Sequence, residues 1–296
     1  MKVFITPEKE AEKAVKTLTR EKKVPSVSSG NSYKPSLKMF TEYVRDQFRG
    51  NLKTATPAQA KSWLEQRSNQ VGQKTLDRDR QAINKWLEYR RYVDTIPKKE
   101  ALSRVDNKNG LAHQSRAYTR EQLDRIQARM PEHHRLAIEV SREAGLRAHE
   151  TATIARIEEQ PADERSWRDD RFRPEQTERY TVIGKGGLVR EVRLTPETAR
   201  KLEDTKRAEP VTVRDRGIDY TSRYNVGYGQ ALSVSFSHHS KAEVGWSAGH
   251  HGIRHTYAQE RVVELQKNGY GYEDAKKVVS QEIGHFSTKH TETYLK

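Results

Sequence analysis

Cysteine is absent from the 296 residues of this sequence, so neither a disulfide framework nor a thiolate zinc ligand can form. No stretch approaches the roughly 18 apolar residues that a helix needs to cross a bilayer. The first residues, MKVFITPEKEAEKAVK, contain no long apolar run and predict no secretory signal. Hydrophobic residues make up 33% of the chain, and its mean hydropathy is -1.01. These absences favour a cytoplasmic protein with modest cores, and the length accommodates two domains.

Positive charge is in excess: 55 lysines and arginines stand against 41 aspartates and glutamates, a net charge of +14. Such an excess is typical of proteins that neutralise phosphates, and binding of this kind weakens steeply with added salt. A merely soluble basic surface is the alternative. Attachment to an anionic membrane would need an amphipathic helix with large apolar anchors, which the sequence does not offer. Nucleic acid is therefore the favoured partner, and no membrane partner is predicted.

Threonine-proline pairs mark the expected helix starts, because threonine caps a helix and proline fits its first turn. The pairs are Thr6-Pro7, Thr56-Pro57 and Thr195-Pro196. The first predicts a charged helix over about 6–22, and the second predicts a helix from residue 57. Between them, VPSVSSGNS at 24–32 predicts a flexible joint. From Pro35 onward, apolar residues recur on one helical face: Leu37, Phe40, Val44 and Phe48.

The segment 74–92, KTLDRDRQAINKWLEYRRY, predicts an amphipathic helix. Leu76, Ile83 and Leu87 share the face that we expect to be buried. The opposite face carries hydrogen-bond donors and no carboxylate: Lys74, Arg78, Gln81 and Lys85. Such a face suits a helix that lies on phosphates or in a major groove, so these four residues are the predicted DNA contacts. A solvated helix face is the alternative that the pattern leaves open.

A polar stretch with Asn-Gly turn chemistry divides the chain. We expect a basic N-terminal extension over 1–26, a helical domain over 27–105, a linker over 106–117 and a larger domain over 118–296. Within the larger domain, 158–178 is a charge-dense loop. The segment 179–194 alternates with period two around Gly-Lys-Gly-Gly, which predicts a β-hairpin with Lys185 at its tip. Arg190 and Arg193 are nearby cations that compete with Lys185 for a role.

Three histidines and an arginine fall within six residues in the stretch HHGIRH, at the start of a helix predicted over 251–267. His251 and Arg254 are three residues apart and share a helix face. An arginine fork beside an imidazole suits a phosphodiester. A metal site would use His251 and His255 with His238 or His239, but it lacks the glutamate of H-E-x-x-H. Ordinary surface or core histidines are the third alternative.

Two further motifs flank this stretch. Upstream, GLRAHE places Arg147 three residues before Glu150, and downstream, Gly284-His285 is followed nine residues later by Tyr294. With the hairpin lysine and H-x-x-R between them, this order resembles the tyrosine recombinases, also called the phage integrase family. The resemblance covers about 118–294, and the helices over 27–105 resemble that family's core-binding domain.

The resemblance implies a mainly α fold with a small β-hairpin sheet (α+β). It would comprise a helical, SAM-like core-binding domain that binds DNA and a tyrosine-recombinase catalytic domain. It also implies that DNA is cleaved and rejoined at a specific site without metal, ATP or another cofactor. The chemistry is coherent, since a tyrosine can conserve the phosphodiester energy in a covalent bond and two arginines can stabilise the charge that develops at phosphorus.

The resemblance assigns one role to each motif residue. Tyr294 would be the nucleophile that forms a 3′-phosphotyrosine, and Arg147 and Arg254 would hold the scissile phosphate. Lys185 would be the general acid to the 5′ oxygen. His251 would accept a proton from Tyr294 or orient it. His285 would donate a hydrogen bond to a phosphate oxygen, and the Glu150 carboxylate would orient these site residues. Tyr257, Tyr270 and Tyr272 are rivals of Tyr294, but they lack its spacing from Gly-His.

The family also implies partners and a setting. Its members act as tetramers on double-stranded DNA. For this chain the resemblance implies integration or excision of a mobile element, in a bacterial or phage nucleoid. It also implies an accessory DNA-bending protein or a second recombinase as partner. In that family a further helix follows the tyrosine and links protomers. This sequence ends two residues past Tyr294, so we expect 1–26, another surface or the loop 158–178 to link protomers, or assembly to be weak and directed by DNA. The alternatives are a non-cleaving DNA-binding accessory protein, a type IB topoisomerase and, more distantly, a zinc hydrolase.

Overall fold

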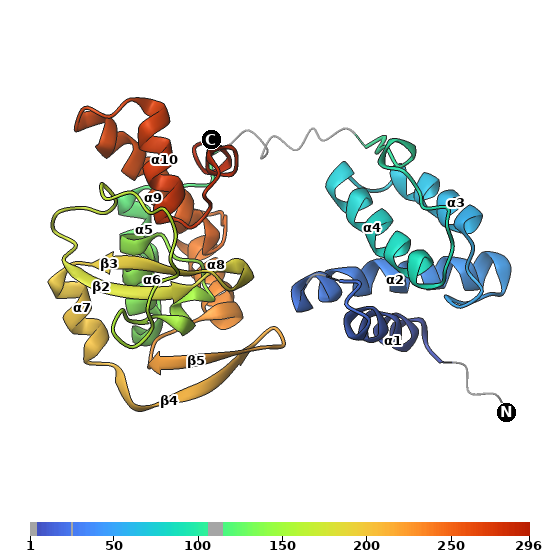
Figure 1. Ribbon diagram of the computed structural model, residues 1–296, viewed down its shortest axis with the longest axis horizontal. Helices are drawn as coiled ribbons and strands as arrows, with labels where there is room; N and C mark the ends of the chain where they lie inside the picture. Colours follow the sequence, from blue (N-terminus) through green and yellow to red (C-terminus); the bar gives the residue numbers. More distant parts are fainter. Residues whose placement is uncertain (1–4, 25, 106–114) are drawn as a thin grey trace. The chain divides into compact units, whose positions relative to one another are not determined.

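The computed structural model describes residues 5–24, 26–105 and 115–296. The chain separates into two compact units, Met1–Asn109 and Gly110–Lys296 (Figure 1). Most of the predicted linker, residues 106–114, lies outside the described residues. None of the described helices is both long and apolar enough to cross a membrane.

The first unit is helical. Its elements are α1 (Pro7–Arg20), α2 (Val27–Phe48), α3 (Pro57–Ser68), α4 (Gln73–Tyr89) and the 3-10 turn η1 (Lys98–Glu100). Two of the predicted caps are present, since Thr6 accepts a hydrogen bond from the Lys9 amide and Thr56 forms a capping box with Gln59. The predicted apolar faces of α2 and α4 meet in one core, where four side chains are 0% exposed: Leu37, Phe40, Ile83 and Leu87.

Two predictions for the start of the chain are wrong. Helix α1 is not a separate extension, because its small apolar face packs into the same core through Ala11, Ala14 and Leu18. The stretch 24–32 is not a joint, because α2 already begins at Val27. Ser26 caps that helix, and Gly30 lets α1 approach closely: a Cβ at Gly30 would lie 3.0 Å from Val15. Serine and glycine here serve capping and packing instead of flexibility.

The second unit combines helices with two small antiparallel sheets (Figure 1). Its first half contains α5 (Arg120–Arg129), α6 (Glu132–Ala144), η3 (Glu150–Thr153), β1 (Ala155–Arg156), β2 (Glu178–Ile183), η4 (Lys185–Gly187), β3 (Val189–Leu194) and α7 (Pro196–Glu203). Its second half contains β4 (Lys206–Asp215), β5 (Ile218–Tyr224), α8 (Gly229–Val244), α9 (His251–Lys267), α10 (Tyr272–Glu282), α11 (Thr288–Thr291) and η5 (Glu292–Tyr294). The mainly α fold with small sheets is therefore confirmed.

The predicted hairpin is present as β2 and β3, whose last pair is Ile183 with Val189. The structure adds β1 to its edge and contains a separate β4–β5 ribbon that the sequence pattern did not predict. Most of β4 is exposed and carries Pro210, so its sequence lacks the alternation that marks a half-buried strand.

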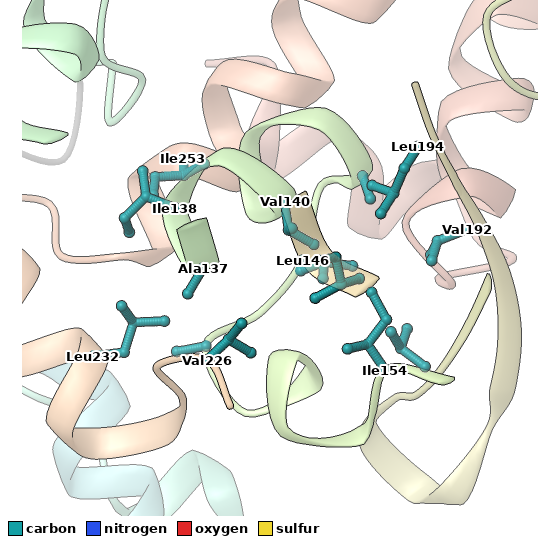
Figure 2. Close-up of a cluster of buried hydrophobic side chains, with 14 of the residues drawn as sticks. Ala137, Ile138, Val140, Leu146, Ile154, Val192, Leu194, Val226, Leu232 and Ile253 are labelled. Atoms are coloured by element: carbon teal, nitrogen blue, oxygen red, sulfur yellow. The ribbon is translucent and has the colours of Figure 1, made fainter. Parts of the chain in front are cut away.

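The core of the second unit anchors the segments that bear the motifs. Leu146 and Ile253, each adjacent to a motif arginine, are 0% exposed and belong to one cluster with Ile138 and Val140 of α6 (Figure 2). A second cluster joins α9, α10 and η5, and it includes Tyr294. Buried neighbours thus fix the backbone on either side of the site.

Candidate active site

Tyr294 lies where three elements meet. It belongs to η5, is 7% exposed, and its ring centroid lies 4.6 Å from His255, 5.0 Å from His285 and 5.2 Å from His251. The Arg254 guanidinium carbon is 5.7 Å from the same centroid. The structure therefore brings together the tyrosine, H-x-x-R and Gly-His motifs, which are separate in the sequence.

Glu150 is the electrostatic centre of the site. Its side chain is 0% exposed and accepts hydrogen bonds from the Arg147 amide at 2.9 Å, Arg147 Nη1 at 2.7 Å and Arg190 Nη2 at 2.7 Å. Arg254 Nη1 lies 3.7 Å away. Burial alone would raise the pKa of Glu150, but the attraction of Arg190, Arg254 and Arg147 outweighs it and lowers that pKa far below its usual range. The carboxylate is therefore ionised and holds three guanidinium groups.

Arg254 is fully buried and joins two loops. Its Nη1 donates to the Gly145 carbonyl at 2.6 Å, and its Nη2 donates to the Ile283 carbonyl. Burial lowers the pKa of Arg254 and Glu150 opposes that effect, so the group stays protonated at neutral pH. Gly145 permits this approach: it has a φ of +61°, and a Cβ there would lie 2.7 Å from the Tyr257 ring.

Arg147 is the more accessible of the two motif arginines, with 19% of its side chain exposed. Its Nη2 lies 3.1 Å from His285 Nε2. His285 occupies a turn between Gly284 and Phe286, both of which have positive φ values. Because a guanidinium only donates, Arg147 donates to Nε2, and the neutral His285 ring carries its proton on Nδ1, which has no partner among the described residues.

Lys185 occupies the predicted position. It is exposed in the β2–β3 turn, where Gly186 and Gly187 have φ values of +81° and +86°. The turn closes with a 2.7 Å hydrogen bond from the Gly184 amide to the Leu188 carbonyl. A Cβ built on Gly184 would lie 3.5 Å from Glu150 Oε1, so the turn begins beside the arginine cluster.

Arg190 is the site residue that sequence reasoning did not assign. It competed with Lys185 for a role in the hairpin, but it is 0% exposed and bonded to Glu150. Its Nε and Nη1 have no hydrogen-bond partner among the described residues. The alternation of residues along the strand could have indicated its burial, because Arg190 shares the inward face of β3 with Val192 and Leu194. Arg193 instead pairs with Glu191 at 2.8 Å.

The rivals of Tyr294 have other partners. Tyr257 is buried and donates to Glu282 Oε2 at 2.9 Å, and both burial and that carboxylate raise its pKa. Tyr272 donates to Glu292 at 3.2 Å. No group of three or more histidine, aspartate or glutamate side chains in the described ranges is placed to hold a metal ion.

The predicted DNA-contact face on α4 differs in one respect from the prediction. Lys74 and Gln81 are exposed, but Lys85 pairs with Glu88 at 2.9 Å, and Arg78 lies 3.5 Å from the buried Asp79. The face was predicted to lack carboxylates, which is wrong, because Glu88 follows Lys85 by one helical turn and reaches its ammonium.

Burial sets the charge state of the histidines in the site. Burial lowers the pKa of four rings, assisted by neighbouring arginines at all but His250: His250 and His285 to about 3, His251 and His255 to about 4. His250 is a buried structural residue whose Nε2 lies 3.1 Å from Ser141 Oγ. The other three surround Tyr294 as neutral imidazoles at pH 7.

These pKa values predict acid sensitivity. In the unfolded chain each ring has a pKa of about 6.5, so as pH falls from 6.5 towards 4 the unfolded state takes up protons that the folded state does not. The free energy of unfolding should then fall by about 1.4 kcal/mol per pH unit for each buried histidine, and by less for the exposed His251. Urea unfolding between pH 7.5 and 5 measures this slope. His285→Asn should make it shallower, whereas His133→Asn, at an exposed position, should not; equal slopes in all three proteins would contradict the assignment.

Comparisons with known proteins find similarity to solved structures but not to family profiles or curated sequences. No protein-family profile matches the sequence, and no curated protein is significantly similar to it. Among solved structures, the XerH site-specific recombinase bound to difH substrate has a TM-score of 0.57 at 18% identity, over 97% of this chain and 81% of its own. The Tn1549 transposon integrase bound to transposon right end DNA has a TM-score of 0.55 at 12% identity, over 99% of this chain and 95% of its own.

A lambda integrase tetramer bound to a Holliday junction has a TM-score of 0.59 at 13% identity, over 100% of this chain and 78% of its own. All three are tyrosine recombinases. The chain is therefore similar along nearly its whole length to proteins of the family that its motifs resemble, and it has the fold of the tyrosine recombinases.

Proposed function

We propose that this protein is a site-specific DNA recombinase that cleaves and rejoins DNA through a 3′-phosphotyrosine. The observation that carries the proposal is the position of Tyr294, whose ring lies within about 5 Å of three neutral histidines and 5.7 Å of the Arg254 guanidinium carbon. A tyrosine held among neutral imidazoles and guanidinium groups is suited to attack a phosphate, because the donors that neutralise the phosphate lie beside the nucleophile.

In the proposed cleavage step, Tyr294 Oη attacks phosphorus as the bond from phosphorus to the 5′ oxygen breaks. The phenol proton passes to His251, which is neutral at pH 7 and can accept it. Lys185 gives a proton to the departing 5′ oxygen. The strand is then held as a 3′-phosphotyrosine and a free 5′ hydroxyl. Attack of a 5′ hydroxyl on the phosphotyrosine reverses these transfers and rejoins DNA, without an external energy source.

The phosphate would be held by Arg147, His285 and Arg254. Arg147 Nη2 donates to the neutral His285 Nε2 at 3.1 Å, so the remaining Arg147 Nη2 hydrogen and the His285 Nδ1–H would be the donors to the phosphate. Both Nη atoms of Arg254 already donate to carbonyls, so this residue would contribute positive charge and its Nε, which has no partner among the described residues. Glu150 would keep the arginines in place without approaching the phosphate itself.

The partners follow from the same comparison. The related XerH and Tn1549 integrase structures contain DNA, and the related lambda integrase is a tetramer on a Holliday junction. For this chain we propose double-stranded DNA with a specific site as the substrate and a tetramer as the active assembly. Integration or excision of a mobile element is the proposed process, and no metal or ATP is required.

The direct test is covalent capture in cells. Cells expressing the protein are lysed in SDS and EDTA, and DNA attached to the protein is recovered and sequenced. Adducts at one recurrent sequence support the proposal and identify the site. Two copies of that site on a plasmid should then exchange strands; relaxation of a plasmid without exchange would indicate a topoisomerase. DNA binding under mild lysis without any adduct would indicate a non-cleaving binding protein.

The α4 face gives a separate prediction. The triple variant Lys74→Ala, Arg78→Ala and Lys85→Ala should weaken DNA binding, and each lost phosphate contact should reduce the salt slope by about one. Fluorescence anisotropy at several salt concentrations measures both quantities. A matched triple at exposed Lys22, Lys23 and Lys99 removes the same charge and should have a smaller effect. Equal losses in the two triples would mean that the α4 face is only solvated.

A further inference from the structure

The 163–173 segment of the charge-dense loop contacts both turns that carry candidate catalytic residues. It begins on β3, where the Asp163 amide donates to the Val189 carbonyl at 2.9 Å and the Val189 amide returns a hydrogen bond to Asp163 Oδ2 at 3.1 Å. Val189 immediately follows the turn that bears Lys185. The segment is therefore fixed beside the lysine turn at its start.

The middle of the segment forms hydrogen bonds with the C-terminal end of α10. The Arg168 amide donates to Gln281 Oε1 at 2.7 Å, and Gln281 Nε2 donates to the Ser166 carbonyl at 3.1 Å. The Phe172 amide donates to Glu282 Oε1 at 2.7 Å. Gln281 and Glu282 are the residues just before the turn that carries His285.

The segment also holds the residue after His285. The Trp167 ring packs on Phe286 with centroids 4.7 Å apart, and the Arg165 guanidinium carbon lies 5.2 Å from the Phe286 ring centroid. The Arg171 guanidinium carbon lies 4.5 Å from the Trp167 ring centroid. Residues 163–173 thus contact the chain on both sides of His285.

Backbone hydrogen bonds close the His285 turn on its α10 side, from the Gly284 amide to the Gln281 carbonyl at 2.9 Å and from the His285 amide to the Ser280 carbonyl at 2.8 Å. Phe286 follows these bonds with a φ of +50°, in the left-handed region that is unfavourable for a residue with a side chain. The Trp167 and Arg165 contacts to the Phe286 ring favour this conformation.

We infer that the 163–173 segment is a brace that positions His285 against Arg147, with Trp167 as its principal positioning residue. The inference rests on the proposed function for its effect on cleavage, but the geometry of His285 can be tested without DNA. It gives this loop a role inside one protomer.

The test compares Trp167→Ala with two matched variants. Trp167→Phe keeps a ring against Phe286, and Trp246→Ala removes an indole that stacks on Tyr118, 4.5 Å away. Histidine NMR on the free protein reports the pKa of His285, which is about 3 in the intact site. Trp167→Ala should raise it towards 6.5 by admitting water, while the other two variants should leave it unchanged.

Single-turnover adduct formation on the captured site is the second readout. Trp167→Ala should react at least tenfold more slowly with unchanged DNA affinity, and Trp167→Phe should restore most of the rate. An unchanged His285 pKa together with an unchanged rate would overturn the brace. If the wild type forms no adduct, the proposed function fails, and the NMR result alone decides on the brace. Should Trp167→Ala not fold, Gln281→Ala removes two contacts from α10 and takes its place with the same expectations.

Discussion

Replacing Tyr294 with phenylalanine should abolish covalent attachment to DNA and leave DNA affinity within about twofold of the wild type. Phenylalanine preserves the ring that packs in the buried cluster with α9 and α10, so the fold should be retained. The variant lacks only the hydroxyl that would attack phosphorus. Loss of a nucleophile typically costs at least about 10⁴-fold in rate, which leaves adducts below detection.

The measurement is recovery of protein-linked DNA after SDS lysis, alongside gel-shift affinity for the recovered site. Tyr257→Phe is the matched control, because it removes a hydroxyl that is hydrogen-bonded to Glu282 in the same helical cluster. This control should still form adducts, with a stability loss of about 1 kcal/mol. Adducts that persist in Tyr294→Phe but vanish in Tyr257→Phe would reassign the nucleophile.

Replacing Glu150 with glutamine should destabilise the second unit by about 3–5 kcal/mol and reduce adduct formation at least a hundredfold. The substitution keeps the shape but removes the only carboxylate that Arg147, Arg190 and Arg254 share among the described residues. Breaking a buried ion pair from one side leaves uncompensated charge, and the cost of that charge is the reason for the large effect. The arginines would then separate, and the phosphate site would lose its geometry.

Urea unfolding at pH 7 measures the loss of stability. Because the pKa of Glu150 is depressed in the folded state, its stabilising effect is complete above about pH 4.3 and is lost only below that pH. Glu158→Gln, at an exposed position, should stay within about 0.5 kcal/mol of the wild type. A Glu150→Gln protein as stable as this control would show that the arginine cluster does not depend on the carboxylate.

Sequence reasoning succeeded where a signal was local. The helix predicted over 251–267 has the bounds of α9, and period-two alternation located the β2–β3 hairpin with Lys185 in its turn. It failed at α1, where a narrow face of Ala11, Ala14 and Leu18 was too small to indicate burial. It failed again for the β4–β5 ribbon, where exposure on both faces removes the alternation.

The sequence by itself therefore determined the order of the motifs, the helix that carries H-x-x-R and the hairpin that carries the lysine, because caps, turns and periodicity act between near neighbours. Only the tertiary structure decided which charges meet. Arg254 reaches the Gly145 carbonyl across 109 residues, and Arg190 reaches Glu150 across 40. Likewise, the 163–173 segment reaches the His285 turn across more than 100 residues, since Arg168 and Gln281 are 113 apart. Contacts at such separations depend on how buried surfaces pack in three dimensions, which no local pattern encodes.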